Sequence, residues 1–533
     1  RRGGRNIKLR RSNVDILCHC QTLRLPIVTR DFALVLFPYR RNELQTELVL
    51  MDRFTQLSSE SDSNVDFESH AKFLIHTSEA NIARIKSQIR DLERICDRER
   101  GIIAGLRAAI APVRKLPAEL LVEIFRRHCD RHTWKFNDTV RKVQELSHVC
   151  AYWRRVAFTT PDLWTNQLRL VLAKTPTDAY AARLKEWVDR SAPLPIDVYL
   201  RCRPGADAAA VVGVLLSAAH RLSAANFNLP LLSVFSCVPP DALKHLQHLQ
   251  LQSPDTTYAP LAAFSLAHNL RTLDLGARQT GRLRLPWSNL EELDMTADTP
   301  QECLDGLLQC TNIVSAQLHM PPWADLPDLS GIKLTTLGRL ERLTITCQPD
   351  AFTSGFFVPF FSCLTLPVLK RLTLDVAFDL TWSATEFTQF QLRSPNIDYL
   401  SIDGAQLSPD DLMTILRHAP SLLELHLAGC RDAFNDIVLE ALCASPRAPV
   451  PLVPRLHTLV VYDSCEDVDD DMLEALITSR WWTDDQLAAF PAPPTVSRWS
   501  RIDIERDGDE AVDREFETKL DEYRAQGLFV HVI

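Results

Sequence analysis

Glycine is scarce in this sequence, with 16 glycines among 533 residues. Phosphate-binding loops need closely spaced glycines so that backbone amides can reach the phosphate oxygens, and neither G-x-x-x-x-G-K-[ST] nor G-x-G-x-x-G occurs. The zinc protease pattern H-E-x-x-H and the hydrolase pattern G-x-S-x-G are also missing. We therefore expect no catalytic residues and no cofactor, and we predict that the protein is not an enzyme.

A surplus of positive charge is missing as well. The chain has 59 basic and 68 acidic residues, a formal net charge of −9, whereas a nucleic-acid-binding domain is usually basic. Its 14 cysteines form no C-x-x-C pair, which argues against a zinc site of the usual spacing. His128, Cys129 and His132 place two histidines four residues apart, but no second ligand pair follows, so we predict no metal. With no secretory signal to indicate export, we expect reduced thiols in the cytoplasm and/or nucleus.

Long hydrophobic runs are also absent. The best membrane candidate is segment 351–369, which has no charge but contains Pro359, Pro367 and several serines and threonines. A membrane-spanning helix needs about 20 predominantly apolar residues in one uninterrupted helix. We therefore expect no membrane partner.

Hydrophobic residues nevertheless make up 46% of the chain, enough for a large core. Residues 1–78 are predicted to be a poorly defined N-terminal segment, with a serine-rich, acidic linker at 52–70. From 79 to 113, apolar side chains recur at alternating spacings of three and four, which is typical of a long amphipathic helix. Two interpretations stay open: a helix that packs against its own domain, and a dimerising coiled coil, which Glu99 in the seam and two nearby glycines disfavour.

Residues 114–168 contain the most specific motif. The pattern L-P-x-E-L-L-x-x-I-F begins at Leu116, L-x-x-V-C-x-x-W-R-x-x-A begins at Leu146, and P-x-L-W ends at Trp164. Apolar residues within each part fall one helical turn apart, so we expect a small three-helix unit. The combination resembles the F-box-like domains of large fungal families, although the polar stretch 126–145 between the first two parts is longer than in a minimal F-box.

This resemblance implies that the unit binds a Skp-type adaptor and, through it, the cullin–RING core of an SCF-type ubiquitin ligase. A helical unit this small cannot bury all of its apolar side chains, so part of them should form the adaptor surface. For the two tryptophans the alternative is a place in the core of the unit itself. The predicted adaptor-binding residues are Leu116, Pro117, Leu120, Leu121, Ile124, Phe125, Val149, Cys150, Trp153, Leu163 and Trp164.

Ten segments of the form L-x-x-L-x-L follow, and their last two apolar positions alternate as in a strand. They begin, at an average spacing of 26 residues, at Leu222, Leu246, Leu270, Leu290, Ile313, Leu340, Leu369, Ile397, Leu422 and Leu456. This pattern resembles a leucine-rich repeat solenoid over 190–533 with a C-terminal cap, which implies an α/β fold with a curved parallel sheet and outer helices. The usual Asn or Cys after the strand occurs only as Cys430, so we expect irregular turns and a distorted horseshoe.

In such a solenoid, the residues between the inward leucines face the concave surface of the sheet. We expect a target protein to bind through mixed polar contacts on this concave face or by the loops at its rim. Basic and acidic side chains alternate along this surface, so no field of one sign marks a nucleic-acid track. The predicted target-binding residues are Arg271, Glu292, Arg342, Arg371, Tyr399, Glu424 and His426.

Two functions are compatible with these features. The first is a substrate-recognition subunit of an SCF-type ubiquitin ligase, in which the F-box holds the adaptor and the repeats hold a target. The second is a non-catalytic scaffold or interaction protein without a ubiquitin role.

Overall fold

The computed structural model describes residues 64–129, 135–165, 168–254, 261–276, 283–321, 334–347, 355–356, 358–376, 380–430, 433–444, 452–464, 468–505 and 514–532. The chain divides into two compact units, Arg1–Lys115 and Leu116–Ile533. Residues 1–63 and His132, for which predictions were made above, lie outside the described residues.

The first unit contains helix α2 (Asn64–Ile110) and the 3-10 turn η1 (Pro112–Lys115). The helix begins within the segment predicted to be a linker, so the linker prediction is wrong for residues 64–70. An ion pair between Lys72 and Glu68, one turn apart, supports this extension. The helix ends before Pro112, which has no backbone N–H to continue it. Its exposed apolar residues include Ile82, Ile85, Ile89, Leu92, Ile103 and Leu106.

The second unit begins with helices α3 (Ala118–Cys129), α4 (Phe136–Val149) and α5 (Ala151–Thr159), followed by the 3-10 turn η2 (Pro161–Trp164). Helix α4 contacts both α3 and α5. It occupies much of the polar stretch that separates the first two parts of the sequence motif. That stretch is therefore mainly an additional length of helix.

The rest of the described second unit is built on a parallel sheet of 14 strands. The strand order is β1-β2-β3-β4-β5-β6-β7-β9-β12-β14-β15-β16-β17-β18. Its strands are β1 (Leu168–Leu172), β2 (Ile196–Cys202), β3 (Leu222–Asn228), β4 (His248–Gln252), β5 (Thr272–Leu275), β6 (Glu292–Thr296), β7 (Ser315–Met320), β9 (Arg342–Cys347), β12 (Arg371–Val376), β14 (Tyr399–Asp403), β15 (Glu424–Ala428), β16 (Thr458–Tyr462), β17 (Arg501–Ile504) and β18 (Phe529–Val532). Two small parallel pairs are β8 (Thr335–Thr336) with β11 (Leu364–Thr365) and β10 (Gly355–Phe356) with β13 (Leu380–Thr381).

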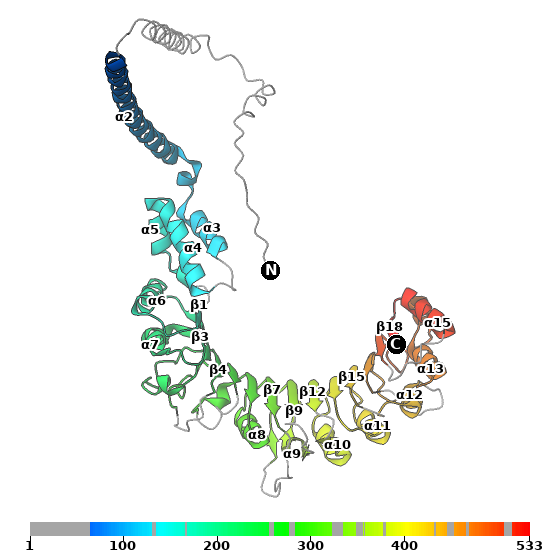
Figure 1. Ribbon diagram of the computed structural model, residues 1–533. Coiled ribbons are helices and arrows are strands. Elements are labelled where there is room, and N and C mark those ends of the chain that lie inside the picture. The colour runs from blue at the N-terminus through cyan, green and yellow to red at the C-terminus, as the bar shows by residue number, and fades with distance from the viewer. Residues whose placement is uncertain are drawn as a thin grey trace. The chain divides into compact units, whose positions relative to one another are not determined.

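Helices and 3-10 turns connect these strands, and Figure 1 shows the helices on the outer side of the arc that the strands line on its inner side. The helices are α6 (Asp178–Arg190), α7 (Ala209–Ser217), α8 (Pro300–Gln309), α9 (Val358–Cys363), α10 (Ala384–Arg393), α11 (Pro409–Arg417), α12 (Asp436–Leu442), α13 (Asp470–Arg480), α14 (Asp484–Ala489) and α15 (Arg514–Ala525). The 3-10 turns are η3 (Ala219–Arg221), η4 (Ser233–Phe235) and η5 (Trp287–Asn289). The predicted α/β solenoid with a curved parallel sheet is confirmed.

The hydrophobic core lies between this sheet and the outer helices. Each of the ten predicted segments contributes a strand, and the two alternating apolar positions of each point to the core, as Leu273 and Leu275 do in β5. The sheet also contains β1, β2, β17 and β18, which the sequence pattern did not predict. At β17 the first leucine of the pattern is replaced by the buried Trp499. The first strand begins at Leu168, upstream of residue 190, where the repeats were predicted to start.

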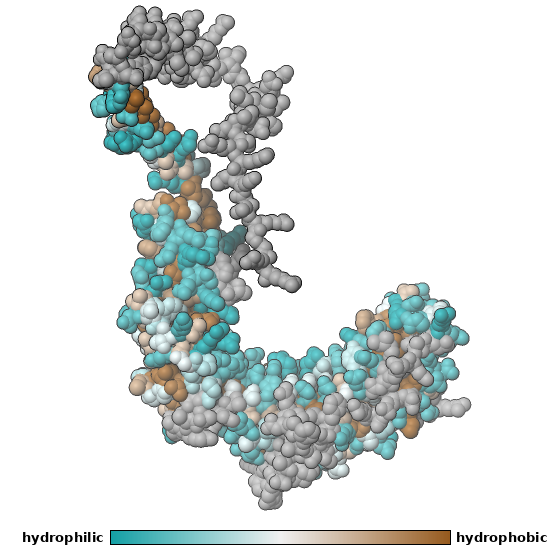
Figure 2. All heavy atoms as spheres, in the orientation of Figure 1, coloured by the Kyte–Doolittle hydropathy of each residue, from teal (hydrophilic) through white to brown (hydrophobic). Residues whose placement is uncertain are grey.

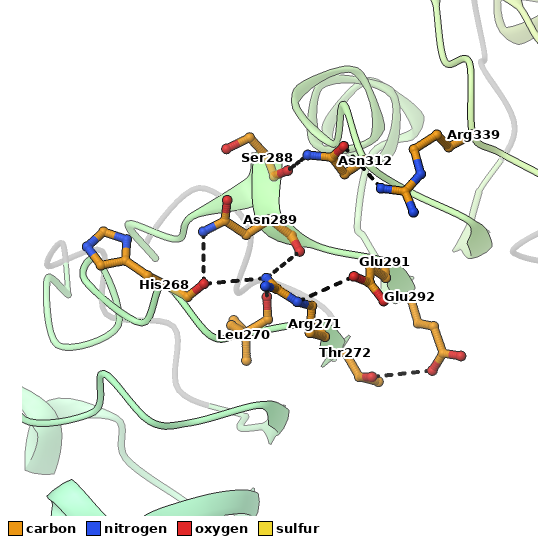
Figure 3. Close-up of polar contacts among 10 residues, drawn as sticks. All are labelled: His268, Leu270, Arg271, Thr272, Ser288, Asn289, Glu291, Glu292, Asn312 and Arg339. Carbon is orange, nitrogen blue, oxygen red and sulfur yellow. Dashed lines mark hydrogen bonds and ion pairs between the residues drawn. The ribbon is translucent and has the colours of Figure 1, made fainter.

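Leucine-rich repeats usually carry an Asn or Cys after the strand. In this chain, asparagines occur instead in the turns that lead into several strands. Each lies one position before the first leucine of its repeat and donates a side-chain hydrogen bond to a carbonyl of the preceding repeat. Asn289 donates to the His268 carbonyl over 3.1 Å and Asn312 to the Ser288 carbonyl over 2.7 Å (Figure 3). Further along the sheet, Asn396 donates to the Pro367 carbonyl in the same way. These side-chain hydrogen bonds, which lie at the exposed turns, tie successive repeats together.

Candidate protein-interaction surfaces

One face of helix α3 is apolar and exposed. Leu120 and Ile124 are 52% and 46% exposed and lie one turn apart, so they share a face of the helix. Leu121 and Phe125, each one residue further on, are fully buried on the other face. Pro117 is exposed just before the helix begins. Helix α3 therefore presents an apolar strip to solvent while its other face anchors it to the core.

The turn between α4 and α5 adds further apolar surface. Val149 is 57% exposed, and Leu116, before α3, is half-buried. Cys150 caps α5, since its sulfur accepts a hydrogen bond from the Trp153 backbone over 3.5 Å. The half-buried Trp153 ring lies 4.9 Å from the Phe125 ring, and its buried indole N–H has no acceptor within the described ranges. Seven of the predicted adaptor-binding residues thus retain exposed or half-exposed surface.

The other four predicted adaptor-binding residues are in the core. Leu121, Phe125, Leu163 and Trp164 are buried, so they are not available on the surface. The Trp164 indole donates to the Ala157 carbonyl over 2.9 Å, which satisfies its polar group internally. Of the two tryptophans for which a place in the core was the alternative, Trp164 is buried, against Trp187 of the first repeat, and Trp153 is half-buried.

An aromatic cluster forms this junction between the helices and the repeats. The Trp187 ring of α6 lies 4.7 Å from Trp164 and 5.7 Å from Phe136. Phe136 also meets Tyr180 of α6 edge-on at 5.5 Å. Edge-to-face contacts of this kind stabilise a packed interface beyond the area they bury. The three helices and the solenoid consequently share one continuous core.

The concave face of the sheet places its first strand residues in one row. Strand register aligns Thr272, Glu292, Ser315, Arg342, Arg371, Tyr399 and Glu424 on neighbouring strands. Five predicted target-binding residues therefore lie in this row, and His426 lies on β15 two residues after Glu424. Figure 2 shows mostly hydrophilic residues along the inner edge of the repeats.

Four of these residues form a connected cluster on β12, β14 and β15. The Arg371 guanidinium lies 4.1 Å from the Tyr399 ring centroid, and the Tyr399 ring lies 5.0 Å from the ring of His426. The Nε2 atom of His426 lies 3.8 Å from a carboxylate oxygen of Glu424. Burial lowers the pKa of His426, so the imidazole is neutral at physiological pH. The cluster offers a planar cation, a ring face and a carboxylate on adjacent strands.

The remaining predicted target-binding residues differ in their contacts. Arg342 donates to the Ser315 hydroxyl over 3.3 Å, which keeps its side chain on the concave row. Glu292 accepts from the Thr272 hydroxyl over 3.3 Å.

Arg271 lies outside the row, and Figure 3 shows its side chain among the turns. Its guanidinium donates to the Asn289 carbonyl over 3.1 Å and lies 3.4 Å from Glu291. These contacts join adjacent repeats and place Arg271 in the turn before β5, outside the concave row, and its role in target binding stays a prediction.

An acidic hollow of about 590 Å³ on the concave face was not singled out from the sequence. Its lining includes Asp274, Asp294, Asp298 and His319. Burial, with a smaller contribution from neighbouring Asp294, raises the pKa of Asp274. The hydrogen bond to Asp294, 3.4 Å away, raises the pKa of His319. The repeat register could have revealed this hollow from the sequence, because it places Asp274 and Asp294 side by side on neighbouring strands.

The remaining features of the described part of the chain concern metal ligands, membrane-spanning helices and reactive thiols. Within the described ranges, no three His, Cys, Asp or Glu residues are arranged to hold a metal ion. No helix of the described chain is long and apolar enough to cross a membrane. The cysteines described are free thiols, and burial raises the pKa of Cys303 and Cys310 to about 12, so these two stay protonated and unreactive.

Comparisons with known proteins give little further identification. No family model matches the chain, and a search of curated proteins found no match. Among solved structures, the chain is similar to a leucine-rich repeat protein of Leptospira interrogans, with 15% sequence identity and a TM-score of 0.37. The match covers 70% of this chain and 85% of that one. The strand register within the sheet defines the repeats of this chain by itself.

Proposed function

We propose that this chain is a substrate-recognition subunit of an SCF-type ubiquitin ligase. In this proposal the F-box-like unit, residues 114–168, binds a Skp-type adaptor, and the concave face of the repeats binds a target protein. The observation that carries it is the exposed strip of Leu120 and Ile124 on a well-anchored helix, within the motif that resembles an F-box. Contiguous exposed apolar surface of this kind favours a protein partner.

Such a subunit performs no bond chemistry of its own, and we propose that this chain has no catalytic residues. It would hold a target lysine near a ubiquitin-charged conjugating enzyme that the cullin–RING core carries. Holding two reactants together raises their effective concentration, and a stiff connection between the binding sites strengthens that effect. The aromatic junction of Trp164 and Trp187 supports the proposal because it links the adaptor unit to the repeats without a flexible linker. The proposed site of action is the cytoplasm or nucleus.

Adaptor binding is tested by truncating the apolar strip. The double variant Leu120→Ala/Ile124→Ala should weaken binding of a purified Skp-type adaptor by about a hundredfold, since buried anchors at an interface each contribute roughly 1–2 kcal/mol or more. Isothermal titration calorimetry on the full chain measures this loss. Both side chains are exposed, so the variant should keep the unfolding temperature of the wild type.

A matched control is Leu392→Ala/Ile437→Ala, which removes two aliphatic side chains exposed on the outer helices α10 and α12. This control should bind the adaptor as the wild type does. Unchanged affinity in Leu120→Ala/Ile124→Ala would refute the adaptor site. A wild-type chain that binds no adaptor would favour the scaffold function instead.

Target binding is tested by reversing charge on the concave row. Arg342→Glu, Arg371→Glu and Glu424→Arg together should reduce recovery of crosslinked target proteins about tenfold or more, because each residue would then repel the group it bound. Proteomic quantification after crosslinking in cells that express the chain measures recovery, and adaptor recovery should not change. The control reverses Arg417 and Glu440, which are exposed on the outer helices. Equal target recovery from both variants would place recognition elsewhere.

A further inference from the structure

A hollow of about 270 Å³ lies at the junction between the three helices and the first repeat. Helices α4 and α5 and the turn η2 line one side of it, and α6 lines the other. Val143, Phe158 and Trp164 supply an apolar, largely aromatic wall. The Phe158 and Trp164 rings are tilted by 50° to each other, so the hollow combines an angled aromatic wall with side chains from two parts of the fold.

One buried polar group in this lining has no partner. Trp187 is 2% exposed and lines the hollow, and its indole N–H has no acceptor among the described residues. An unpaired buried donor costs roughly 1–3 kcal/mol, so most such groups in folded proteins are paired with protein or water. An occupant that brings an acceptor to this position would recover that free energy.

The same hollow has an excess of positive charge. Arg190 is already engaged, since it pairs with Glu186 at 2.6 Å and lies over the Phe158 ring at 4.2 Å. Arg154 makes a 3.0 Å hydrogen bond to the Ser147 carbonyl. In the described part of the chain, no carboxylate lies within ion-pair distance of Arg154 or Arg183. The one carboxylate of the lining, Glu186, pairs with Arg190, so Arg154 and Arg183 have no ion-pair partner among the described residues.

We propose that this hollow binds a small organic anion with a flat apolar body. The anionic group would pair with Arg154 and Arg183 and bring an acceptor to the Trp187 N–H, while the flat body would stack on the Arg190 guanidinium, which itself lies over the Phe158 and Trp164 rings. Its volume is near the lower end of the range of about 300–1,000 Å³ typical of small-molecule pockets, which favours a ligand of one or two fused rings. This inference does not depend on a ubiquitin role for the protein.

The probe that fits this description is 2-naphthoate, titrated into the full chain by isothermal titration calorimetry. It should bind saturably at one site, and 2-naphthalenemethanol, which has the same rings without the charge, should bind at least tenfold more weakly. Bound ligand should also raise the unfolding temperature, because it favours the folded state. Inorganic phosphate, which lacks the rings, should bind more weakly than 2-naphthoate.

Two variants assign the site. Arg183→Gln should weaken 2-naphthoate binding about tenfold, as should Trp187→Phe, which keeps an aromatic ring but removes the indole N–H. Arg183 is exposed, so its variant should fold as the wild type does. The control Arg417→Gln, an exposed arginine on α11, should bind like the wild type. No saturable binding of 2-naphthoate at millimolar concentration, or equal binding by Arg183→Gln and the wild type, would overturn the proposal.

Discussion

At the scale of single residues, Asp503 on β17 is surrounded by donors. Its carboxylate accepts from the Tyr462 hydroxyl over 2.7 Å, lies 2.5 Å from the Arg501 guanidinium, and lies 3.2 Å from Nδ1 of His531. Burial alone would raise the pKa of Asp503, but the bonds from Arg501, Tyr462 and His531 outweigh it, and the pKa lies below its usual value. This carboxylate joins the last three strands of the sheet.

Asp503→Asn should therefore lower the free energy of unfolding by about 1–2 kcal/mol, because the buried Asp503 side chain would lose its charge-assisted hydrogen bonds, while the half-exposed Arg501 stays solvated. Hydrogen exchange of β16 to β18 measures the loss. The control is Asp403→Asn, which should be neutral or stabilising, since burial and the neighbouring Asp375 and Asp463 raise the pKa of Asp403. Equal effects of the two substitutions would contradict this account.

The lowered pKa of Asp503 also gives a pH dependence. A carboxyl group whose pKa is lower in the folded than in the unfolded state stabilises the fold above the unfolded pKa of about 3.9 and loses that contribution as pH falls through the folded pKa. Protection of β17 should therefore hold down to about pH 4 and decline below it. In Asp503→Asn this decline should be smaller.

At the scale of elements, helix α2 contains two glycines that serve no steric purpose. A Cβ atom built at Gly101 or Gly105 meets no atom within 4 Å. Replacing both with alanine should stabilise the C-terminal part of the helix by about 1 kcal/mol per site, since glycine costs that much in a helix interior. Slower amide exchange over residues 95–110 would show this gain. The control Gly205→Ala should instead destabilise its turn, because Gly205 has a φ of +85°. Unchanged or faster exchange in the α2 variant would contradict the account.

The repeats could be predicted because an alternating strand pattern determines which side chains enter the core. Leu372 and Leu374 illustrate this, since both are buried where the pattern places them. Strand β17 was missed because tryptophan replaces its first leucine, and the pattern alone does not show that a ring can fill that place. The burial of Trp164 was left open because the ring that packs against it, Trp187, belongs to α6, which lies outside the motif at 114–168. The cluster of Arg371, Tyr399 and His426 required the register between strands.

At the scale of the whole molecule, the second unit combines two different surfaces. Helices α3 to α5 and the concave row belong to one compact body, Leu116–Ile533, connected through the aromatic junction. We predict that a partner on α3 leaves the row from Glu292 to Glu424 accessible. Simultaneous binding of adaptor and target is the central requirement of a substrate-recognition subunit.

Hydrogen–deuterium exchange of the full chain, with and without a saturating Skp-type adaptor, tests this requirement most directly. We predict new protection over α3 and the α4–α5 turn when the adaptor binds, with exchange of β5 to β15 unchanged. The Leu120→Ala/Ile124→Ala variant should lose this protection. No protection of α3, or protection centred on the concave strands, would contradict the proposal that this chain joins an adaptor to a target.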